Sequence, residues 1–586
     1  MGKKQKNKGN NTPKKTEDKQ NLPGEKEESL KEINNHKTQN EESTSGKIAY
    51  REMISVLILL LLEIFFWRNI ITTDGMLGDQ GDGRFTALIT EHWWQFFCGK
   101  ESFSTIPIFY PNATSLGYSD LHLGFGVFHS LLRLFGGSIY PAFKWSVILM
   151  HLMGLITMYI LLRGVLKVSV VWSMIGSVGF SHCCSMSALS LHPQLFAVAM
   201  LPVLLILFIG FIRNLKNRKK RNIYAYLTLA WFILLVYTSW YMACFTGIFS
   251  LVFLIVYAIA LSAKKYKPFS MLMDTIKTIG VDLIGYIIFT IVLAIPFISI
   301  YVPVMKEGSM YEYSGFYLPD LIDLINVTEN NLMMGWFMKL INIGARGRDH
   351  ELAEGYSIVF LILFIIVCVD LFRIKKKELK LEQILPKSII ISVIVCLLLT
   401  LRWDGANMSL WAVVYALLLP ARAVHAVCRF LMWLCFPMSI MIAYWADGHK
   451  FMKNEKIKPF IASAVLALLV FSTINKGGVC TAFNYLDREV FMDSVTPAPE
   501  DMESFYVTNV AYEDEPWFAS NIDAWEVALK VGKPTLNGYS GHFPQGWGLS
   551  DPLMENYEPY AQYWIENHGL QNVYTYDLAT GEWAKR

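Results

Sequence analysis

Long apolar runs constrain this chain more than any other feature of its sequence. Of its 586 residues 53% are hydrophobic and only 17% are charged. The apolar residues gather in runs of about twenty, the length at which a helix crosses the hydrocarbon core of a bilayer. Lipid offers the backbone no hydrogen bonds, so each crossing must be a helix or part of a closed barrel. The runs are continuous rather than alternating, and they therefore predict an all-α polytopic membrane protein.

The apolar runs and the basic loops between them predict a topology. We expect about 11 transmembrane helices, one for each run of sufficient length. The predicted spans are 54–71, 142–162, 168–188, 193–213, 223–240, 243–262, 276–301, 357–373, 387–402, 424–445 and 459–474. Basic clusters at 213–221, 264–267, 373–377 and 450–458 all fall on the same side as the Lys-rich N-terminus. Since basic loops favour the cytoplasm, we expect a cytoplasmic N-terminus and an extracytoplasmic C-terminus.

Three regions follow from this topology. Residues 1–48 are polar and basic and are poor in apolar groups, so we expect a disordered cytoplasmic tail. Residues 49–474 are the predicted transmembrane domain, with extracytoplasmic loops at 72–140 and 303–356. Residues 475–586 are the predicted extracytoplasmic C-terminal domain.

The C-terminal segment alternates between strand-like and helical patterns. Residues 505–510 and 573–576 are rich in β-branched and aromatic residues and predict strands. Residues 521–531 lie between them and predict a helix, and a glycine-rich turn occupies 537–541. The sequence therefore predicts a small α/β domain after the last span.

The first outer loop carries two aspartates in a glycine-rich turn. In residues 74–84 (DGMLGDQGDGR), Asp79 and Asp82 lie close to Arg84. Glycines let the backbone bend, so that both carboxylates can converge on one spot. A partly desolvated carboxylate at the membrane surface suits a general base, or a ligand of a divalent metal such as Mg²⁺ or Mn²⁺. The alternative is that the turn caps the following helix, since Asp favours helix starts.

A second set of charged residues lies late in the chain. On a continuous helix Arg422 and Arg429 fall about 20° apart, with His425 about 60° from that line. The predicted topology places them at the outer leaflet, and an Arg at mid-membrane costs roughly 2.5–3.5 kcal/mol on insertion scales. A lipid phosphate would satisfy both guanidinium groups. The alternative is that the side chains reach out to lipid headgroups from a helix end.

Further motifs in the first loop carry a resemblance to a known family. The loop continues with 108–111 (IFYP) and 116–124 (LGYSDLHLG), which contain Asp120. A long first outer loop, acidic directly after the first span and followed by these motifs, resembles the GT-C superfamily of membrane glycosyltransferases. Within the superfamily the sequence is most similar to the bacterial YfhO-like and related polytopic families. Residues 192–194 (HPQ) and the 420–430 stretch are similar as well.

The resemblance implies a GT-C-like fold and a glycosyltransferase activity. In the superfamily a first-loop aspartate is the catalytic base and the donor is a sugar on a polyprenyl phosphate. Asp79 or Asp82 would take that role here, and the tandem acidic pair of better-known members is absent, so the choice stays open. The acceptor would be a cell-surface glycan, a lipid or a protein. We expect a bacterial plasma membrane, membrane lipids as partners, and no nucleic acid.

Seven side chains besides the two aspartates are predicted to bind substrate. They are Arg84, His92, Asp120, His192, Arg422, His425 and Arg429. Arg422 and Arg429 would hold the lipid phosphate, and Arg84 would orient the aspartates. If a metal is used, Asp79 and Asp82 are its expected ligands.

Two other functions remain open from the sequence. A transporter or flippase of lipid-linked glycans would predict internal repeats and paired broken helices. No clear repeat is visible, and simple translocation does not require large outer loops. A non-enzymatic protein of envelope assembly is the third hypothesis, and it would tolerate loss of both aspartates.

Overall fold

The computed structural model describes residues 50–308, 313, 317–348, 350–374, 381–403, 408–449, 458–479, 481–511 and 516–586. The predicted N-terminal tail lies outside these residues. The chain forms two compact units, Met1–Leu57 and Ile58–Arg586. Residues 50–57 of the first unit are helical, and the second unit begins with helical residues 58–66. All elements named below belong to the second unit.

Six helices in the described part of the chain are long and apolar enough to cross a membrane. They are Ile139–Val165, Pro193–Arg213, Trp240–Ser262, Asp282–Lys306, Gln383–Thr400 and Val427–Gly448. Each coincides with a predicted span, so the chain is a multi-pass membrane protein of mainly helical fold. The other predicted spans fall on shorter or more polar helices, and the count of about 11 stays a prediction.

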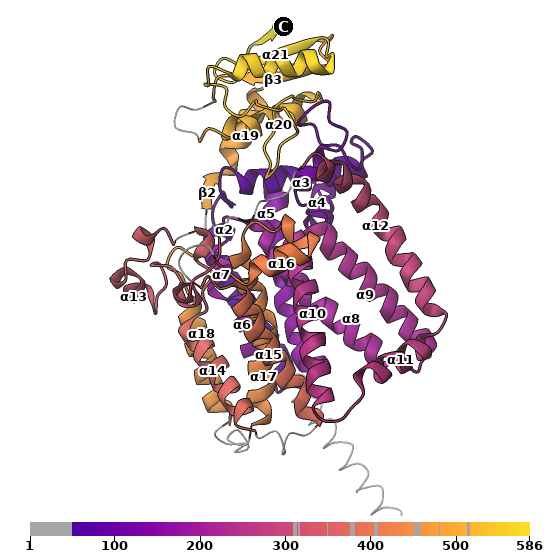
Figure 1. Ribbon diagram of the computed structural model, residues 1–586. Helices are drawn as coiled ribbons and strands as arrows, with labels where there is room; N and C mark the ends of the chain where they lie inside the picture. Colours follow the sequence, from indigo (N-terminus) through magenta and orange to yellow (C-terminus); the bar gives the residue numbers. More distant parts are fainter. Residues whose placement is uncertain are drawn as a thin grey trace, which may run out of the picture. The chain divides into compact units, whose positions relative to one another are not determined.

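The membrane region is a bundle of helices (Figure 1) that differ greatly in how much of their surface is buried. They are α2 (Arg68–Ile71), α5 (Ile139–Tyr159) with a π-helical end (Ile160–Val165), α6 (Val170–Ser181), α7 (Cys184–Ala188), a 3₁₀ helix (Pro193–Met200) leading into α8 (Leu201–Arg213), α9 (Arg218–Thr238), α10 (Trp240–Ser262), α11 (Pro268–Ile279), α12 (Asp282–Lys306), α14 (Ile358–Arg373), α15 (Leu381–Thr400), α17 (Phe430–Gly448) and α18 (Lys458–Thr473). Nearly all of α17 is buried, whereas most of α12 is exposed and apolar. In a membrane protein an exposed apolar helix surface is the surface that lipid covers, so α17 is central and α12 is peripheral.

The first loop folds onto the ends of the long helices. It contains β1 (Gly75–Leu77), α3 (Asp82–Phe97), a 3₁₀ turn (Ser115–Tyr118) and α4 (Leu123–Leu134). One hydrophobic cluster includes Phe85 and Trp93 of α3, Ile300 of α12 and Trp525 of the C-terminal segment. This packing fixes α3 between the membrane helices and the C-terminal elements, where Figure 1 also shows it.

The C-terminal segment is a small α/β arrangement, as predicted. Its elements are β2 (Thr481–Asn484), α19 (Tyr485–Ser494), β3 (Ser504–Thr508), α20 (Ala519–Val531), α21 (Tyr557–His568), β4 (Val573–Asp577) and β5 (Trp583–Lys585). β3 and β4 pair in parallel, with Ser504 opposite Val573, and β5 pairs antiparallel with β4. β2 pairs antiparallel with β1 of the first loop, so the segment is joined to that loop by backbone hydrogen bonds. The predicted boundary at residue 475 remains a prediction.

Short elements fill the remaining loops. They are α13 (Gly335–Leu340), 3₁₀ turns at Leu321–Ile325, Gly344–Arg346 and His350–Leu352, α16 (Trp411–Leu417), and 3₁₀ turns at Leu419–Ala423 and Val427–Arg429. The two 3₁₀ turns between α16 and α17 are separated by extended backbone at Val424 and Ala426. The 317–356 loop and the 419–429 stretch both reach the cavity described next.

Candidate active site

A cavity of about 560 Å³ lies where the first loop, α10, α12 and the C-terminal segment meet. Its polar lining comes from segments far apart in the sequence. These side chains are Asp82, Thr86, Ser119, Asp120, His122, Gln194, Glu351, His425, Arg429 and His542. Its aromatic lining consists of Phe85, Tyr118, Trp240, Tyr241, Phe297, Tyr301, Tyr317 and Tyr539. The volume falls within the roughly 300–1,000 Å³ of small-molecule sites, and the mixed lining suits a ligand with both polar and apolar parts.

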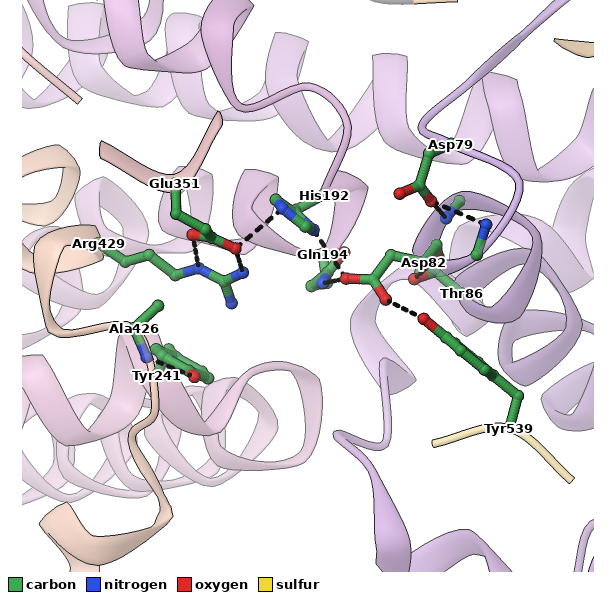
Figure 2. Close-up of polar contacts among 12 residues, drawn as sticks. Asp79, Asp82, Thr86, His192, Gln194, Tyr241, Glu351, Ala426, Arg429 and Tyr539 are labelled. Atoms are coloured by element: carbon green, nitrogen blue, oxygen red, sulfur yellow. Dashed lines mark hydrogen bonds and ion pairs between the residues drawn. The ribbon is translucent and has the colours of Figure 1, made fainter. Parts of the chain in front are cut away.

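Asp82 is the first residue of α3, and its side chain faces this cavity. His192 Nδ1 donates to Asp82 Oδ2 at 2.7 Å and Gln194 Nε2 donates to the same oxygen at 3.3 Å. Tyr539 Oη donates to Asp82 Oδ1 at 3.3 Å (Figure 2). Burial raises the pKa of Asp82, but the bond and charge of His192 outweigh it, and the pKa lies below its usual value. Asp82 is therefore an oriented carboxylate, ionised at neutral pH, and its side chain is 30% exposed.

Asp79, unlike Asp82, binds backbone amides at the start of α3. Its Oδ1 accepts hydrogen bonds from the backbone amides of Gly81 and Gly83, at 3.0 and 3.1 Å (Figure 2). These amides belong to the turn that begins α3, and a carboxylate in this position satisfies N–H groups that the helix leaves open. Burial and the charge of Asp82 raise the pKa of Asp79. The two interpretations of the acidic turn thus divide between the residues: Asp79 caps the helix and Asp82 faces the cavity.

His192 bridges two carboxylates. Its Nδ1 lies 2.7 Å from Asp82 Oδ2, and its Nε2 lies 2.9 Å from Glu351 Oε1 (Figure 2). An imidazole can donate through both nitrogens only when it is protonated. Burial alone lowers the pKa of His192, but the bonds to Asp82 and Glu351 raise it to about 9. At neutral pH the residue is an imidazolium that holds Asp82 in place.

Glu351 continues this chain of contacts to Arg429. Arg429 Nε donates to Glu351 Oε2 at 3.0 Å, and an Nη amino group donates to Oε1. The other amino group turns away from Glu351 in Figure 2, and the guanidinium lies 4.9 Å from the centre of the Tyr241 ring. Burial raises the pKa of Glu351, but the charges of Arg429 and His192 outweigh it and lower the pKa well below its usual value. Asp82, His192, Glu351 and Arg429 thus form a row of alternating negative and positive charges along the cavity wall.

The predicted helical stripe of Arg422, His425 and Arg429 is wrong. These residues lie on two 3₁₀ turns joined by extended backbone, and α17 begins only at Phe430. Arg429 and His425 line the cavity, whereas Arg422 donates to the carbonyl of Tyr415 at 3.3 Å and lies over its ring. Pro420 lies in the first of these turns, and it prevents α16 from continuing through this stretch as a helix. The structure therefore brings Arg429 to the cavity without Arg422.

Arg84 and His92 do not lie at the aspartates. Arg84 is fully buried and pairs with Asp523 and Glu526 of α20, the latter at 3.1 Å. It therefore cannot orient Asp79 or Asp82 as predicted. His92 is buried and its Nδ1 lies 2.5 Å from Glu101 Oε2. Both side chains point into the packed body of α3 and its neighbours rather than toward the cavity.

Asp120 does line the cavity, next to a histidine that the sequence did not single out. The Asp120 carboxylate accepts from the Trp240 amide at 3.2 Å, at the start of α10, and burial raises its pKa to about 6. His122 is buried and has a left-handed backbone, with φ of 51°. Within the described part of the chain its Nδ1 has no hydrogen-bond partner, and burial lowers its pKa to about 4. Asp120 and His122 together make a polar wall beside Asp82.

The two aspartates do not fit the predicted metal site. Asp79 is occupied by backbone amides, and both oxygens of Asp82 accept hydrogen bonds, one of them from an imidazolium. In the described residues the group of three potential ligands that lie within 4.8 Å of one another is Glu351, Glu354 and Cys428. Glu351 in that group already pairs with Arg429 and His192.

Sequence reasoning missed several residues of the site, although signals for some of them were present. Gln194 follows His192 in the HPQ motif, His122 lies in the LGYSDLHLG stretch, and Tyr539 lies in the glycine-rich turn at 537–541. Glu351 lies in a loop without any periodic pattern. Its role becomes visible only when the loop is placed against Arg429 and His192.

Comparisons with known proteins were made for the sequence and for the fold. No protein-family model matches the sequence, and no curated protein matches it. Among solved structures, the archaeal oligosaccharyltransferase AglB from Archaeoglobus fulgidus, in complex with an inhibitory peptide and a dolichol-phosphate, is 11% identical with a TM-score of 0.47. That match covers 90% of this chain and 69% of AglB.

ArnT from Cupriavidus metallidurans is a second similar structure. Its complex with undecaprenyl phosphate is 13% identical, covers 82% of this chain and 85% of ArnT, and has a TM-score of 0.33. Both of these solved structures align along most of this chain.

Proposed function

We propose that the protein is a membrane glycosyltransferase that moves a sugar from a polyprenyl-phosphate donor to an acceptor hydroxyl. The observation that carries this proposal is Asp82, an ionised and oriented carboxylate in a polar cavity at the ends of membrane helices. An aspartate so placed can act as a general base. Arg429 lies across the same cavity and offers a cation for a phosphate.

The reaction requires one proton transfer and one exchange of bonds. The acceptor hydroxyl gives its proton to Asp82 as its oxygen bonds to the anomeric carbon of the donor sugar. The bond between that carbon and the phosphate oxygen breaks, and the polyprenyl phosphate leaves with the electron pair. The amino group of Arg429 that faces away from Glu351 stabilises the phosphate as its negative charge grows.

The walls of the cavity suit a lipid-linked donor. α12 lines it with Phe297, Tyr301, Val304 and Met305, while most of the remaining surface of this helix is exposed and apolar. A polyprenyl chain can lie along such a surface, with its phosphate in the polar cavity. The donor would then enter from the lipid beside α12, in the outer leaflet of a bacterial plasma membrane.

The orientation proposed for the chain follows from its basic loops. The N-terminus would be cytoplasmic, and the first loop, the 303–356 loop and the C-terminal segment would face outward. The acceptor would be a cell-surface glycan, a lipid or a protein, and it would reach Asp82 from the side of the C-terminal segment. This is the side from which Tyr539 and His542 line the cavity.

Mass spectrometry of lipid-linked sugars and surface glycans tests this function directly. We compare cells without the protein, cells with wild type and cells with Asp82→Asn at equal protein levels. A polyprenyl-phosphate sugar should accumulate, and one glycan decoration should disappear, in the first and third strains. An unchanged profile in the Asp82→Asn strain contradicts the enzymatic role and favours transport or scaffolding.

The protonated His192 predicts a decline of activity at high pH. Because the pKa of His192 is raised to about 9, its imidazole is fully protonated at neutral pH and loses a proton as the pH rises through that value. A neutral imidazole donates through one nitrogen only, so either Asp82 or Glu351 loses its hydrogen bond from His192. We expect the transfer rate to fall by about tenfold per pH unit above the pKa.

Rates of sugar transfer between pH 7 and pH 10 by the purified protein measure this effect. His192→Asn should be slower at every pH and should lack the decline, whereas His92→Asn is the matched control. His92 pairs with Glu101 away from the cavity, so this variant should keep the wild-type profile. A decline that persists in His192→Asn would assign it to another group.

A further inference from the structure

The turn that supplies Tyr539 to Asp82 continues into an exposed aromatic surface. Tyr539, Gly541 and His542 line the cavity, and Phe543 is the next residue. Phe543 is 39% exposed, so its ring meets solvent directly beside the cavity. The surface therefore begins where the proposed active site ends.

The ring of Phe543 is packed against a neighbouring aromatic ring. Its ring stacks on Trp547, with centroids 4.9 Å apart and planes 1° from parallel. Trp547 is fixed by a hydrogen bond from its Nε1 to the carbonyl of Leu536 at 2.9 Å, and by an edge contact with Phe109. Trp547 covers one face of the Phe543 ring and Phe109 lies nearly perpendicular to it, with centroids 6.1 Å apart, so the 39% of the side chain that stays exposed is the part available to a ligand.

Two tyrosines of α21 extend this aromatic surface, and each of them lies beside a glycine. A Cβ atom at Gly548 would lie 2.5 Å from the Tyr560 ring, so the absent side chain lets that ring lie on the backbone. Tyr563 lies beside Gly546, at 3.7 Å from the position a Cβ would take there. Tyr560 is 41% exposed and Tyr563 is 53% exposed. We call Phe543, Trp547, Tyr560 and Tyr563 the aromatic platform.

The charges around the platform indicate which polymer would bind it. Residues 534–568 contain Asp551, Glu555, Glu558 and Glu566 but neither Lys nor Arg, and of these acids Glu558 is paired with Arg586 from outside the segment. This acidic setting disfavours anionic polymers and anionic lipid headgroups. Sugar rings present C–H groups that pack on aromatic faces, and their hydroxyls donate to carboxylates, as in sites lined by aromatic residues with a few polar groups.

We propose that the aromatic platform binds the sugar chain of the acceptor, a glycan without anionic groups, and leads its end to Asp82. This proposal rests on the proposed function, because it takes the cavity as the place of transfer. It names the acceptor as a polymer of several sugar units rather than a single sugar or a protein side chain. The units next to the reacting one lie on Phe543, and more distant units reach Tyr560 and Tyr563.

A glycan array with the full chain in nanodiscs of phosphatidylcholine tests the proposal. The array carries neutral and anionic oligosaccharides from one to eight units, and the protein variants are wild type, Asp82→Asn, the double variant Phe543→Ala/Tyr563→Ala, and Trp336→Ala. Trp336 is 66% exposed on α13, outside the platform, and serves as the matched control for loss of an exposed aromatic ring.

Wild type should bind neutral oligosaccharides, and more tightly as they lengthen. The double variant should bind about tenfold more weakly, as expected when two contact rings are lost. Trp336→Ala should bind like wild type, Asp82→Asn should keep the dependence of affinity on glycan length, and thermal melting should show that the double variant folds. The proposal is overturned if wild type binds only anionic glycans or none, or if the double variant binds as tightly as wild type.

The same variants separate this proposal from the proposed function. Glycan binding does not require catalysis, so Asp82→Asn reports on binding alone. If Asp82→Asn still transfers sugar while the double variant loses binding, the base is wrong but the platform stands. If Asp82→Asn is inactive while the double variant binds and transfers normally, the enzyme stands and the platform is wrong.

Discussion

Asp82→Asn is expected to slow sugar transfer by about 10²- to 10⁴-fold, the usual contribution of a positioned general base. An asparagine has the same shape but cannot take the acceptor proton. It also removes the negative charge that His192 holds through its 2.7 Å contact. Single-turnover transfer by purified protein in nanodiscs, with a saturating polyprenyl-phosphate sugar, measures the loss in the chemical step.

Asp79→Asn is the matched control, because it makes the same change three residues earlier in the chain. The Oδ1 of Asp79 accepts both of its amide hydrogen bonds, from Gly81 and Gly83, and an asparagine oxygen can accept them as well. We expect a loss of less than about tenfold, since the cap survives. A larger loss in Asp79→Asn than in Asp82→Asn would reverse the assignment of the base.

Arg84→Leu is expected to destabilise the folded protein by about 3–5 kcal/mol, as removal of one partner from a buried ion pair does. Arg84 and Arg488 pair with Asp523 and Glu526, and all four side chains are at most 3% exposed. Tyr140 of α5 also donates to Glu526. Without Arg84 two buried carboxylates share a single arginine.

Thermal unfolding of the purified protein, with limited proteolysis of the C-terminal segment, measures this effect. Arg218→Leu is the control, because Arg218 pairs with Asp282 but is 70% exposed, and exposed pairs contribute little. The double variant Arg84→Leu/Asp523→Leu restores the balance of charge and should recover part of the stability. If Arg84→Leu melts like wild type, the buried network does not hold α3 to α20.

Regular elements of this protein could be predicted because their signals are local. Apolar runs located the six membrane helices, β-branched and aromatic residues located β3 and β4, and a helical pattern located α20. The prediction that Arg422 and Arg429 lie on one face of a helix was wrong for a local reason as well. A continuous helix was assumed from Arg422 to Arg429, where the backbone instead forms two 3₁₀ turns joined by extended residues.

The composition of the candidate site could be predicted only in part, because its contacts are distant in sequence. Asp82 and His192 carried recognisable motifs, but nothing near either residue indicates that they touch. Arg84 looked like a partner of the neighbouring aspartates, yet its partner Asp523 lies 439 positions away. Glu351 has no motif at all, and only the folded loop shows its place between His192 and Arg429.

The joining of the first loop to the C-terminal segment has a consequence for how the protein is made. Asp82 leaves the ribosome 457 residues before Tyr539, which at about 5–20 residues per second is a delay of roughly 20–90 s. During that time β1 has no strand to pair with and Arg84 has no carboxylates to meet, although the early helices can already enter the membrane. The cavity that holds the proposed active site is therefore completed last, when Tyr539 arrives, so incomplete chains in the membrane lack part of its wall.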